Sequence, residues 1–318
     1  MPARRPGKKP ASHALELAAI QASLADAAYI GDEEIALALY LAQHLQKPIL
    51  VEGPPGVGKT DLARAASAWT ERPLIRLQCY EGLDESMTLY EWQYGKQLLY
   101  TQILKAQLEP ILGTSRDLAG ALKRLHAMKE HFFAKEFLLP RPLLQALQTD
   151  GGAVLLIDEV DKSDDEFEAF LLEFLSEFQL SIPEWGTVRA ATPPLVFLTS
   201  NNRRPLGDAL KRRCLHLYMD FPTRAREEAI IAAHAPMLNA RLRAELVRFV
   251  QALRQLELKK PPAISESVDW AKSLLLLHAA ELDEGFVRKS LNVLLKFQSD
   301  VELAQESLPQ LLRAAGEA

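Results

Sequence analysis

Eight consecutive residues have the types and the spacing needed to hold a polyphosphate. They are Gly53, Pro54, Pro55, Gly56, Val57, Gly58, Lys59 and Thr60, which fit the pattern G-x-x-x-x-G-K-[ST]. Glycine lets the backbone amides turn inward toward phosphate oxygens, Lys59 places positive charge on the β- and γ-phosphates, and the Thr60 hydroxyl ligates Mg²⁺. The expected ligands are therefore ATP and Mg²⁺.

Two adjacent carboxylates, Asp158 and Glu159, follow the apolar run 153–157. Such a run predicts a strand buried on both faces of a parallel sheet, which ends beside the phosphate loop. We expect Asp158 to hold Mg²⁺, directly or through water, and Glu159 to orient and activate the attacking water. Without the phosphate loop, a solvated helix start would explain the pair equally well.

A polar tip follows the predicted strand 195–199. We expect Asn201 to hydrogen-bond the attacking water or the γ-phosphate, with Asn202 as the alternative. The alternative is a turn residue that ends a strand, because Asn is common in turns.

Basic residues lie between the last predicted core helix and the strand 214–218. In an isolated domain, Arg212 and Arg213 would interact favourably with the helix C-terminus. In a ring, one of them could reach the γ-phosphate bound to the neighbouring subunit as an arginine finger. We favour Arg213 over Arg212 for that role.

The proposed site requires strand ends that meet at one edge of a sheet. Strands are predicted at 48–52, 74–78, 153–158, 195–199 and 214–218, and core helices at 14–28, 33–45, 59–69, 118–133, 141–148, 164–178 and 207–212. A hairpin is expected at 180–188, and the aromatic-rich stretch 82–103 is predicted to be an insertion. The pattern indicates an α/β doubly wound fold, a P-loop NTPase αβα core with a parallel sheet.

The predicted domain boundary lies after residue 222, because no strand is predicted beyond that point. Residues 1–25 are expected to form a flexible tail and the start of the first helix, residues 26–222 the nucleotide-binding core, and residues 223–318 an all-α lid domain.

The composition argues against several kinds of partner and cellular location. Lys and Arg total 37 against 42 Asp and Glu, and this net charge of -5 gives no general attraction to nucleic acid. No apolar run approaches the roughly 20 residues that span a bilayer, and no signal peptide is recognised. Cys79 and Cys214 suggest neither a disulfide framework nor a thiolate metal site. We expect a cytoplasmic protein.

The order of these motifs, from the phosphate loop to the helical lid, resembles the AAA+ ATPases over nearly the whole chain after the first 25 residues or so. Within that group, the insertion, the hairpin and the chain length resemble the MoxR family. The segments 90–99 and 261–270 further resemble its branch that matures carbon monoxide dehydrogenase and related molybdenum hydroxylases.

The resemblance implies a homo-oligomeric ring, usually a hexamer, with ATP at the subunit interfaces. It also implies a partner protein with a von Willebrand factor A domain and a client metalloenzyme. The family's pore-facing elements would correspond to the regions around Trp92 and Trp185, although ordinary packing is the alternative for both residues.

The same resemblance implies two further roles, a second sensor in the lid and a polar switch. AAA+ lids commonly present a second sensor arginine, but Glu266 stands at the corresponding helix start. Either Lys272 or another lid residue substitutes, or the lid couples to the nucleotide differently. Gln78 could restrain Glu159 as a polar switch, although a Gln at a strand end is more often merely solvated.

Three rival functions remain open from the sequence. A small-molecule kinase would transfer the phosphoryl group to a metabolite, but Glu159 and the large helical region argue against it. An ATP-dependent switch or scaffold would bind partners without sustained turnover. A DNA-directed AAA+ protein would share the same core, because a fold alone does not fix function.

Overall fold

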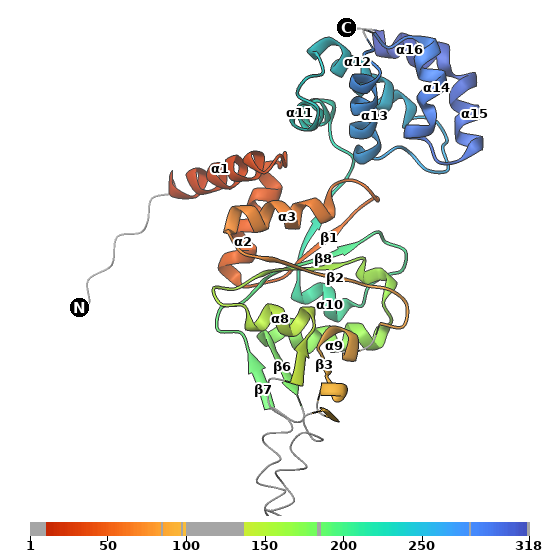
Figure 1. The fold of residues 1–318 in the computed structure, drawn as a ribbon. Helices are drawn as coiled ribbons and strands as arrows, with labels where there is room; N and C mark the ends of the chain where they lie inside the picture. Colours follow the sequence, from red (N-terminus) through yellow and green to blue (C-terminus); the bar gives the residue numbers. More distant parts are fainter. Residues whose placement is uncertain are drawn as a thin grey trace, which may run out of the picture.

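The computed structural model describes residues 11–83, 85–96, 98–99, 137–182, 186–279 and 281–316. Figure 1 shows a core built around a central sheet, with a group of helices above it that forms the C-terminal lobe. The helices α1 (Ala11–Asp26) and α2 (Glu33–Leu45) precede the sheet. Helix α1 ends two residues before its predicted limit, and Ala28 follows with a left-handed φ of 58°.

Five parallel strands form the central sheet in the order β2-β5-β8-β1-β9. They are β1 (Ile49–Glu52), β2 (Leu74–Gln78), β5 (Val154–Asp158), β8 (Leu195–Ser200) and β9 (Leu215–Tyr218). Every residue of β1, β5 and β8 is buried. The continuous apolar runs therefore predicted these strands correctly, with ends within one residue of those observed.

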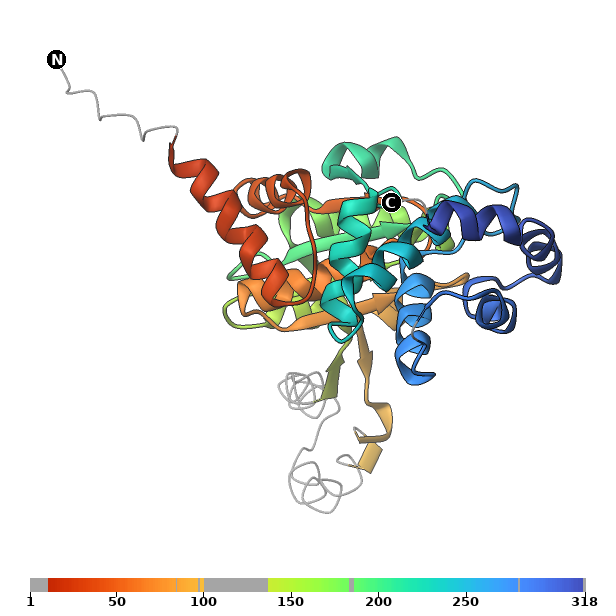
Figure 2. The ribbon, with the colours of Figure 1, turned by 90° about the horizontal axis from the view of Figure 1, so that it is seen from above.

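Helices cover both faces of the sheet (Figures 1 and 2). Alternate residues of β5 point to opposite faces: Val154 and Leu156 pack in one core cluster, and Leu155 and Ile157 in another. The first cluster contains residues of α1, α2 and α3 (Lys59–Thr70). The second contains residues of α8 (Pro142–Gln148), α9 (Asp165–Glu177) and α10 (Asp208–Arg213). These layers make the αβα core expected from the sequence.

Two short pairs of antiparallel strands extend from the core, and the second pair forms a hairpin. Strand β3 (Tyr90–Trp92) follows α4 (Glu85–Thr88) and pairs antiparallel with β4 (Leu138–Pro140), and β6 (Gln179–Ile182) pairs with β7 (Gly186–Arg189). The hairpin agrees with the prediction for 180–188. The predicted insertion 82–103 includes α4 and β3, and its predicted end lies outside the described residues. The predicted helix 118–133 and Trp185 lie outside the described residues.

Trp92 belongs to a small hydrophobic cluster with residues from both strand pairs, β3–β4 and β6–β7. Its side chain is 9% exposed and packs with Leu138, Leu144 and Ile182. Burial supports ordinary packing for this tryptophan, which was the alternative to a pore-facing position.

The C-terminal lobe consists of helices, as predicted. They are α11 (Arg224–His234), α12 (Ala240–Leu253), α13 (Ile264–Leu276), α14 (Glu284–Leu294), α15 (Gln298–Glu306) and α16 (Leu308–Gly316). Among the helices that the structure describes, none is long and apolar enough to cross a membrane. The domain limits 26–222 and 223–318 remain a prediction.

A buried ion pair joins three of these helices. Arg254 donates to both carboxylate oxygens of Glu227 at 2.7 Å, and the Ser267 hydroxyl donates to the same carboxylate at 2.9 Å. The two charged side chains are 7% and 0% exposed. Arg254 also lies over the Phe221 ring, 4.7 Å from its centroid, at the start of the lobe.

Arg254→Ala is expected to lower the free energy of unfolding by about 3–5 kcal/mol, because it leaves the Glu227 carboxylate buried without its counter-charge. Chemical denaturation would measure the loss. Arg241→Ala is the matched control, since Arg241 is 84% exposed in its pair with Glu245 and should cost less than about 1 kcal/mol. Equal losses for the two variants would contradict the prediction.

Candidate nucleotide site

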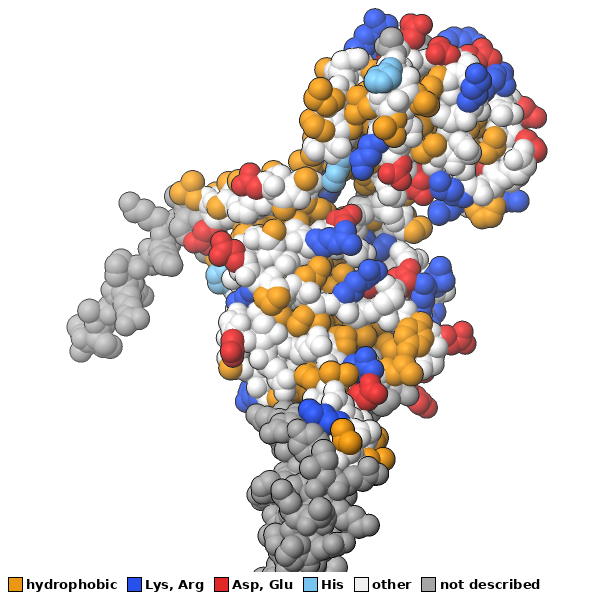
Figure 3. Space-filling view, viewed as in Figure 1, with side chains coloured by type: hydrophobic (Ala, Val, Ile, Leu, Met, Phe, Trp, Pro, Cys, Tyr) orange, Lys and Arg blue, Asp and Glu red, His pale blue; other side chains and the backbone are white. Residues whose placement is uncertain are grey.

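A cavity of about 860 Å³ lies where the core meets the C-terminal lobe. Figure 3 shows the surface hollowed between these two parts. The lining combines three sets of residues. They are the phosphate loop (55–60), residues in or just after the sheet strands (Arg76, Gln78, Asp158, Glu159, Thr199 and Asn201), and the lobe residues Ile264, Ser265, Val268, Asp269 and Lys272. A cavity of this size accommodates a nucleotide-sized ligand.

The phosphate loop depends on glycine at two tight positions. Gly53 has a φ of 149°, and a Cβ there would lie 2.0 Å from the Met219 carbonyl oxygen. Gly56 has a φ of 76°, and its Cβ would lie 2.4 Å from the Cβ of Ala263, just before α13. The loop leads directly into α3, whose N-terminus favours negative charge. Its path therefore requires glycine both for conformation and for close approach.

Lys59 is the first residue of α3 and folds back onto the phosphate loop. Its amine donates hydrogen bonds to the carbonyl oxygens of Gly53 at 2.6 Å and Pro54 at 2.7 Å, and to Asn201 Oδ1 at 2.8 Å. Burial lowers the pKa of Lys59 to about 8, and the nearby carboxylates act in the opposite direction. A bound phosphate would further favour the protonated amine.

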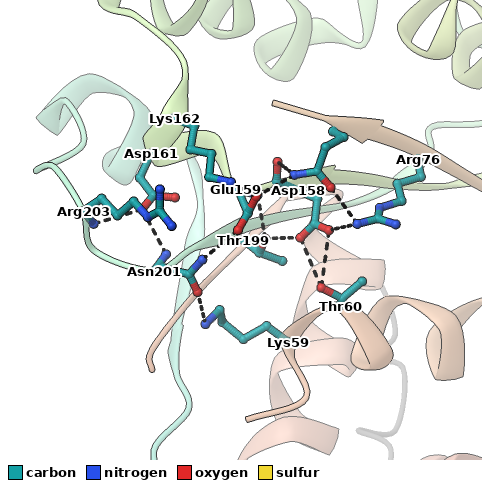
Figure 4. Close-up of polar contacts among 11 residues, drawn as sticks. Lys59, Thr60, Arg76, Asp158, Glu159, Asp161, Lys162, Thr199, Asn201 and Arg203 are labelled. Carbon is teal, nitrogen blue, oxygen red and sulfur yellow. Dashed lines mark hydrogen bonds and ion pairs between the residues drawn. The ribbon is translucent and has the colours of Figure 1, made fainter. Parts of the chain in front are cut away.

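Asp158 lies at the carboxyl end of β5, beside Thr60 (Figure 4). The Thr60 hydroxyl is 3.2 Å from Asp158 Oδ1, and the Thr199 hydroxyl donates to the same oxygen at 2.5 Å. Hydroxyl and carboxylate oxygens are ligands that Mg²⁺ accepts, usually together with substrate phosphates. The pair predicted to bind Mg²⁺, Thr60 and Asp158, is thus brought together with suitable donor atoms.

Glu159 is surrounded by polar side chains from three elements. Its Oε1 accepts from Asn201 Nδ2 at 3.1 Å, and its Oε2 accepts from Gln78 Nε2 at 2.8 Å and from the Lys162 amine. Its backbone N–H donates to Thr199 Oγ1 at 2.9 Å. Gln78 therefore contacts Glu159, as the polar-switch interpretation requires.

Asn201 bridges Lys59 and Glu159, and its role toward the attacking water or the γ-phosphate stays a prediction. The alternative, Asn202, is exposed, and its backbone N–H donates to Ser200 Oγ at 3.0 Å. Asp161 fixes the loop that carries Asn201, because its Oδ2 accepts from the backbone N–H groups of Asn201 at 3.2 Å and Arg203 at 2.9 Å.

Asp161, Lys162, Thr199 and Arg76 were not predicted as site residues. Asp161 is 4% exposed and contacts the loop after β8. Arg76 pairs with Asp158, with Nη2 2.6 Å from Oδ2. The sequence did indicate that Arg76 and Gln78 point in the same direction, because residues two apart in a strand share one face.

The two candidate finger arginines lie away from this cavity. Both are exposed at the end of α10. Arg213 Nε donates to Ser176 Oγ of α9 at 2.8 Å, and its Nη1 donates to the Ala209 carbonyl at 3.1 Å. The structure therefore does not bring Arg213 or Arg212 to the nucleotide cavity of the same chain.

The lobe contributes a different set of groups from the expected sensor. Glu266 caps α13: its carboxylate accepts from the Ala263 N–H at 3.1 Å and from the Ser265 hydroxyl at 2.8 Å. Lys272, two turns along the same helix, lines the cavity. Arg226 also lines it, but its guanidinium donates to Ile30 O at 3.0 Å and to Asp32 Oδ2 at 2.5 Å.

Residues 48–214 match the family described as AAA domain (dynein-related subfamily). Two similar proteins are the gas vesicle ATPase GvpN of Haloferax mediterranei, 27% identical over 66% of this chain and 57% of its own length, and the denitrification regulatory protein NirQ of Stutzerimonas stutzeri, 23% identical over 66% and 64%. A solved structure of the Thermotoga maritima RuvB Holliday junction branch migration motor aligns with a TM-score of 0.44 and 16% identity, covering 82% of this chain and 67% of that one. With its phosphate loop, paired carboxylates and helical lobe around one cavity, the chain belongs to the dynein-related AAA family and is an AAA+ P-loop ATPase.

Proposed function

We propose that this AAA+ ATPase is a MoxR-type chaperone that hydrolyses ATP to remodel a partner protein. The main support is a series of hydrogen bonds from Lys59 through Asn201 to Glu159. These residues lie next to Asp158 and Thr60, in a cavity that both the core and the lobe line. A phosphate-binding amine, a sensor amide and a candidate base are thus already connected. Such an arrangement suits transfer of the γ-phosphoryl group to water.

Each residue has a distinct part in that reaction. The loop amides and Lys59 bind and orient the phosphates, and Glu159 accepts the proton of the attacking water. Asn201 holds Glu159 Oε1 and reports the γ-phosphate through Lys59. Thr60 and Asp158 would hold Mg²⁺, which neutralises charge on the phosphate oxygens when bound. Lys272 takes the place of the lid's sensor arginine, since it is a basic lobe residue that lines the cavity.

A homo-oligomeric ring, with a hexamer as the expected size, completes the site in this proposal. Arg213 is exposed and lies outside its own chain's cavity. A residue so placed can serve a neighbouring subunit, where an arginine finger stabilises transition-state charge. The contact with Ser176 must then exchange for the neighbour's phosphate.

The proposed partners are a von Willebrand factor A domain protein and a client metalloenzyme, such as a molybdenum hydroxylase. The support is the resemblance of segments 90–99 and 261–270 to the carbon monoxide dehydrogenase maturation branch. The second segment includes Ala263, which contacts the phosphate loop at Gly56. Cytoplasmic location is part of the proposal, and the net charge of -5 argues against a nucleic-acid partner.

Nucleotide-dependent assembly tests this function. Light scattering after size exclusion should show a ring of the wild type with Mg²⁺ and ATP, accompanied by phosphate release. Lys59→Ala should stay unassembled under the same conditions, because it lacks the amine that binds the phosphates. A wild type that binds ATP as a monomer without turnover would instead support the switch or scaffold function.

A further inference from the structure

Arg76 pairs with the carboxylate that is proposed to bind Mg²⁺. Its Nη2 lies 2.6 Å from Asp158 Oδ2, while the Thr199 and Thr60 hydroxyls are nearest to Oδ1. The Asp158 side chain is 5% exposed and the Arg76 side chain 47%. Arg76 comes from β2, at the edge of the sheet, and is one of the residues that line the nucleotide cavity.

The same guanidinium nitrogen also reaches the residue that restrains Glu159. Arg76 Nη2 donates to Gln78 Oε1 at 2.6 Å, and Gln78 Nε2 donates to Glu159 Oε2 at 2.8 Å. Arg76 and Gln78 therefore connect the two acidic residues predicted for the site, Asp158 and Glu159. Figure 4 shows Arg76 on one side of Asp158 and Thr60 beneath it.

A buried carboxylate is costly unless a positive charge compensates it. Arg76 supplies that charge in this structure, and Mg²⁺ would supply it at the same carboxylate in the loaded site. Two cations at one carboxylate repel each other strongly when little water separates them. A Mg²⁺ ion held by Asp158 would therefore compete with Arg76 for this carboxylate.

We infer that Arg76 is a positioning residue that occupies Asp158 until Mg²⁺ and nucleotide arrive. When its guanidinium leaves Asp158, Arg76 no longer holds Gln78 in place against Glu159. Binding of Mg²⁺ at Asp158 therefore allows Glu159 to move. This inference rests on the proposed role of Asp158 as a Mg²⁺ ligand.

The test is the Mg²⁺ dependence of binding of a fluorescent ADP analogue. For Arg76→Gln, the Mg²⁺ concentration at half-maximal binding should fall roughly three- to fivefold, the upper part of the range expected for loss of one partly exposed ion pair. Arg76→Lys keeps the charge and should stay within about twofold of the wild type. An unchanged or increased Mg²⁺ requirement for Arg76→Gln would overturn the inference.

Arg64→Gln is the matched control for loss of charge near the cavity. Arg64 also lines the cavity, but its guanidinium pairs with the exposed Asp61 and not with Asp158. A general electrostatic effect would change the Mg²⁺ requirement equally in both variants and would contradict a specific competition. The specific effect should be much larger for Arg76→Gln.

Thermal unfolding supplies a second measurement that does not use activity. Arg76→Gln should lower the Tm of the metal-free protein, because Asp158 loses its counter-charge. The difference from the wild type should shrink with saturating Mg²⁺ and ADP, whereas a purely structural arginine would give the same difference in both conditions.

Failure of the inference can be told apart from failure of the proposed function. If nucleotide binding by the wild type does not depend on Mg²⁺, and Asp158→Ala changes nothing, the assigned Mg²⁺ site itself is wrong. If the wild type requires Mg²⁺ and Asp158→Ala abolishes that requirement while Arg76→Gln behaves as wild type, only the competition is wrong.

Discussion

Glu159→Gln is expected to slow ATP hydrolysis by a factor of about 10²–10⁴ while ATP binding is retained. The amide preserves the shape of the side chain and can still contact Asn201 and Gln78, but it cannot accept a proton from water. Lys59, Thr60 and the loop amides remain in place to hold the phosphates. Steady-state phosphate release together with equilibrium binding of ATP would measure the two effects separately.

Glu166→Gln is the matched control, because Glu166 is exposed in the first turn of α9, a few residues from Glu159. It should hydrolyse ATP at the wild-type rate. Equal rates for Glu159→Gln and the wild type would show that Glu159 is not the base. Loss of ATP binding in Glu159→Gln would indicate a role in holding the loop through Asn201 and Lys59.

Arg213→Ala is expected to reduce hydrolysis by about 10³-fold or more, and a mixture with Glu159→Gln is expected to recover part of the rate. In a mixed ring, a subunit with intact Glu159 can lie beside a subunit with intact Arg213. That interface then contains every group of the proposed site, although neither variant alone can form one. Phosphate release measured across mixing ratios, with ring assembly checked by light scattering, would test this.

Arg212→Ala is the matched control for removing a charge from the end of α10. A large loss for Arg212→Ala and a small one for Arg213→Ala would transfer the finger role to Arg212. A loss in Arg213→Ala without recovery on mixing, in rings that do contain both variants, would contradict action between subunits. The contact with Ser176 would then indicate a role in packing α10 against α9.

The sequence by itself determined the phosphate loop and the strands that support it. Gly53 to Thr60 is a local pattern whose chemistry follows from residue type and spacing, and the structure shows why Gly53 and Gly56 cannot carry a side chain. The strand ending in Asp158 was recognisable because a strand buried on both faces must be continuously apolar. Asn201 was predicted from a second rule, that the carboxyl ends of parallel strands meet at one edge of the sheet.

Only the tertiary structure decided which groups surround these residues. Arg76 and Gln78 reach Asp158 and Glu159 because β2 pairs with β5, where Gln78 lies opposite Asp158. Asp161 holds the Asn201 loop across 40 residues of sequence. Glu266 caps its own helix, and the lobe brings Lys272 to the cavity instead. Such contacts depend on strand order and on packing between distant segments, whereas local residue spacing carries information only about neighbours along one strand or helix.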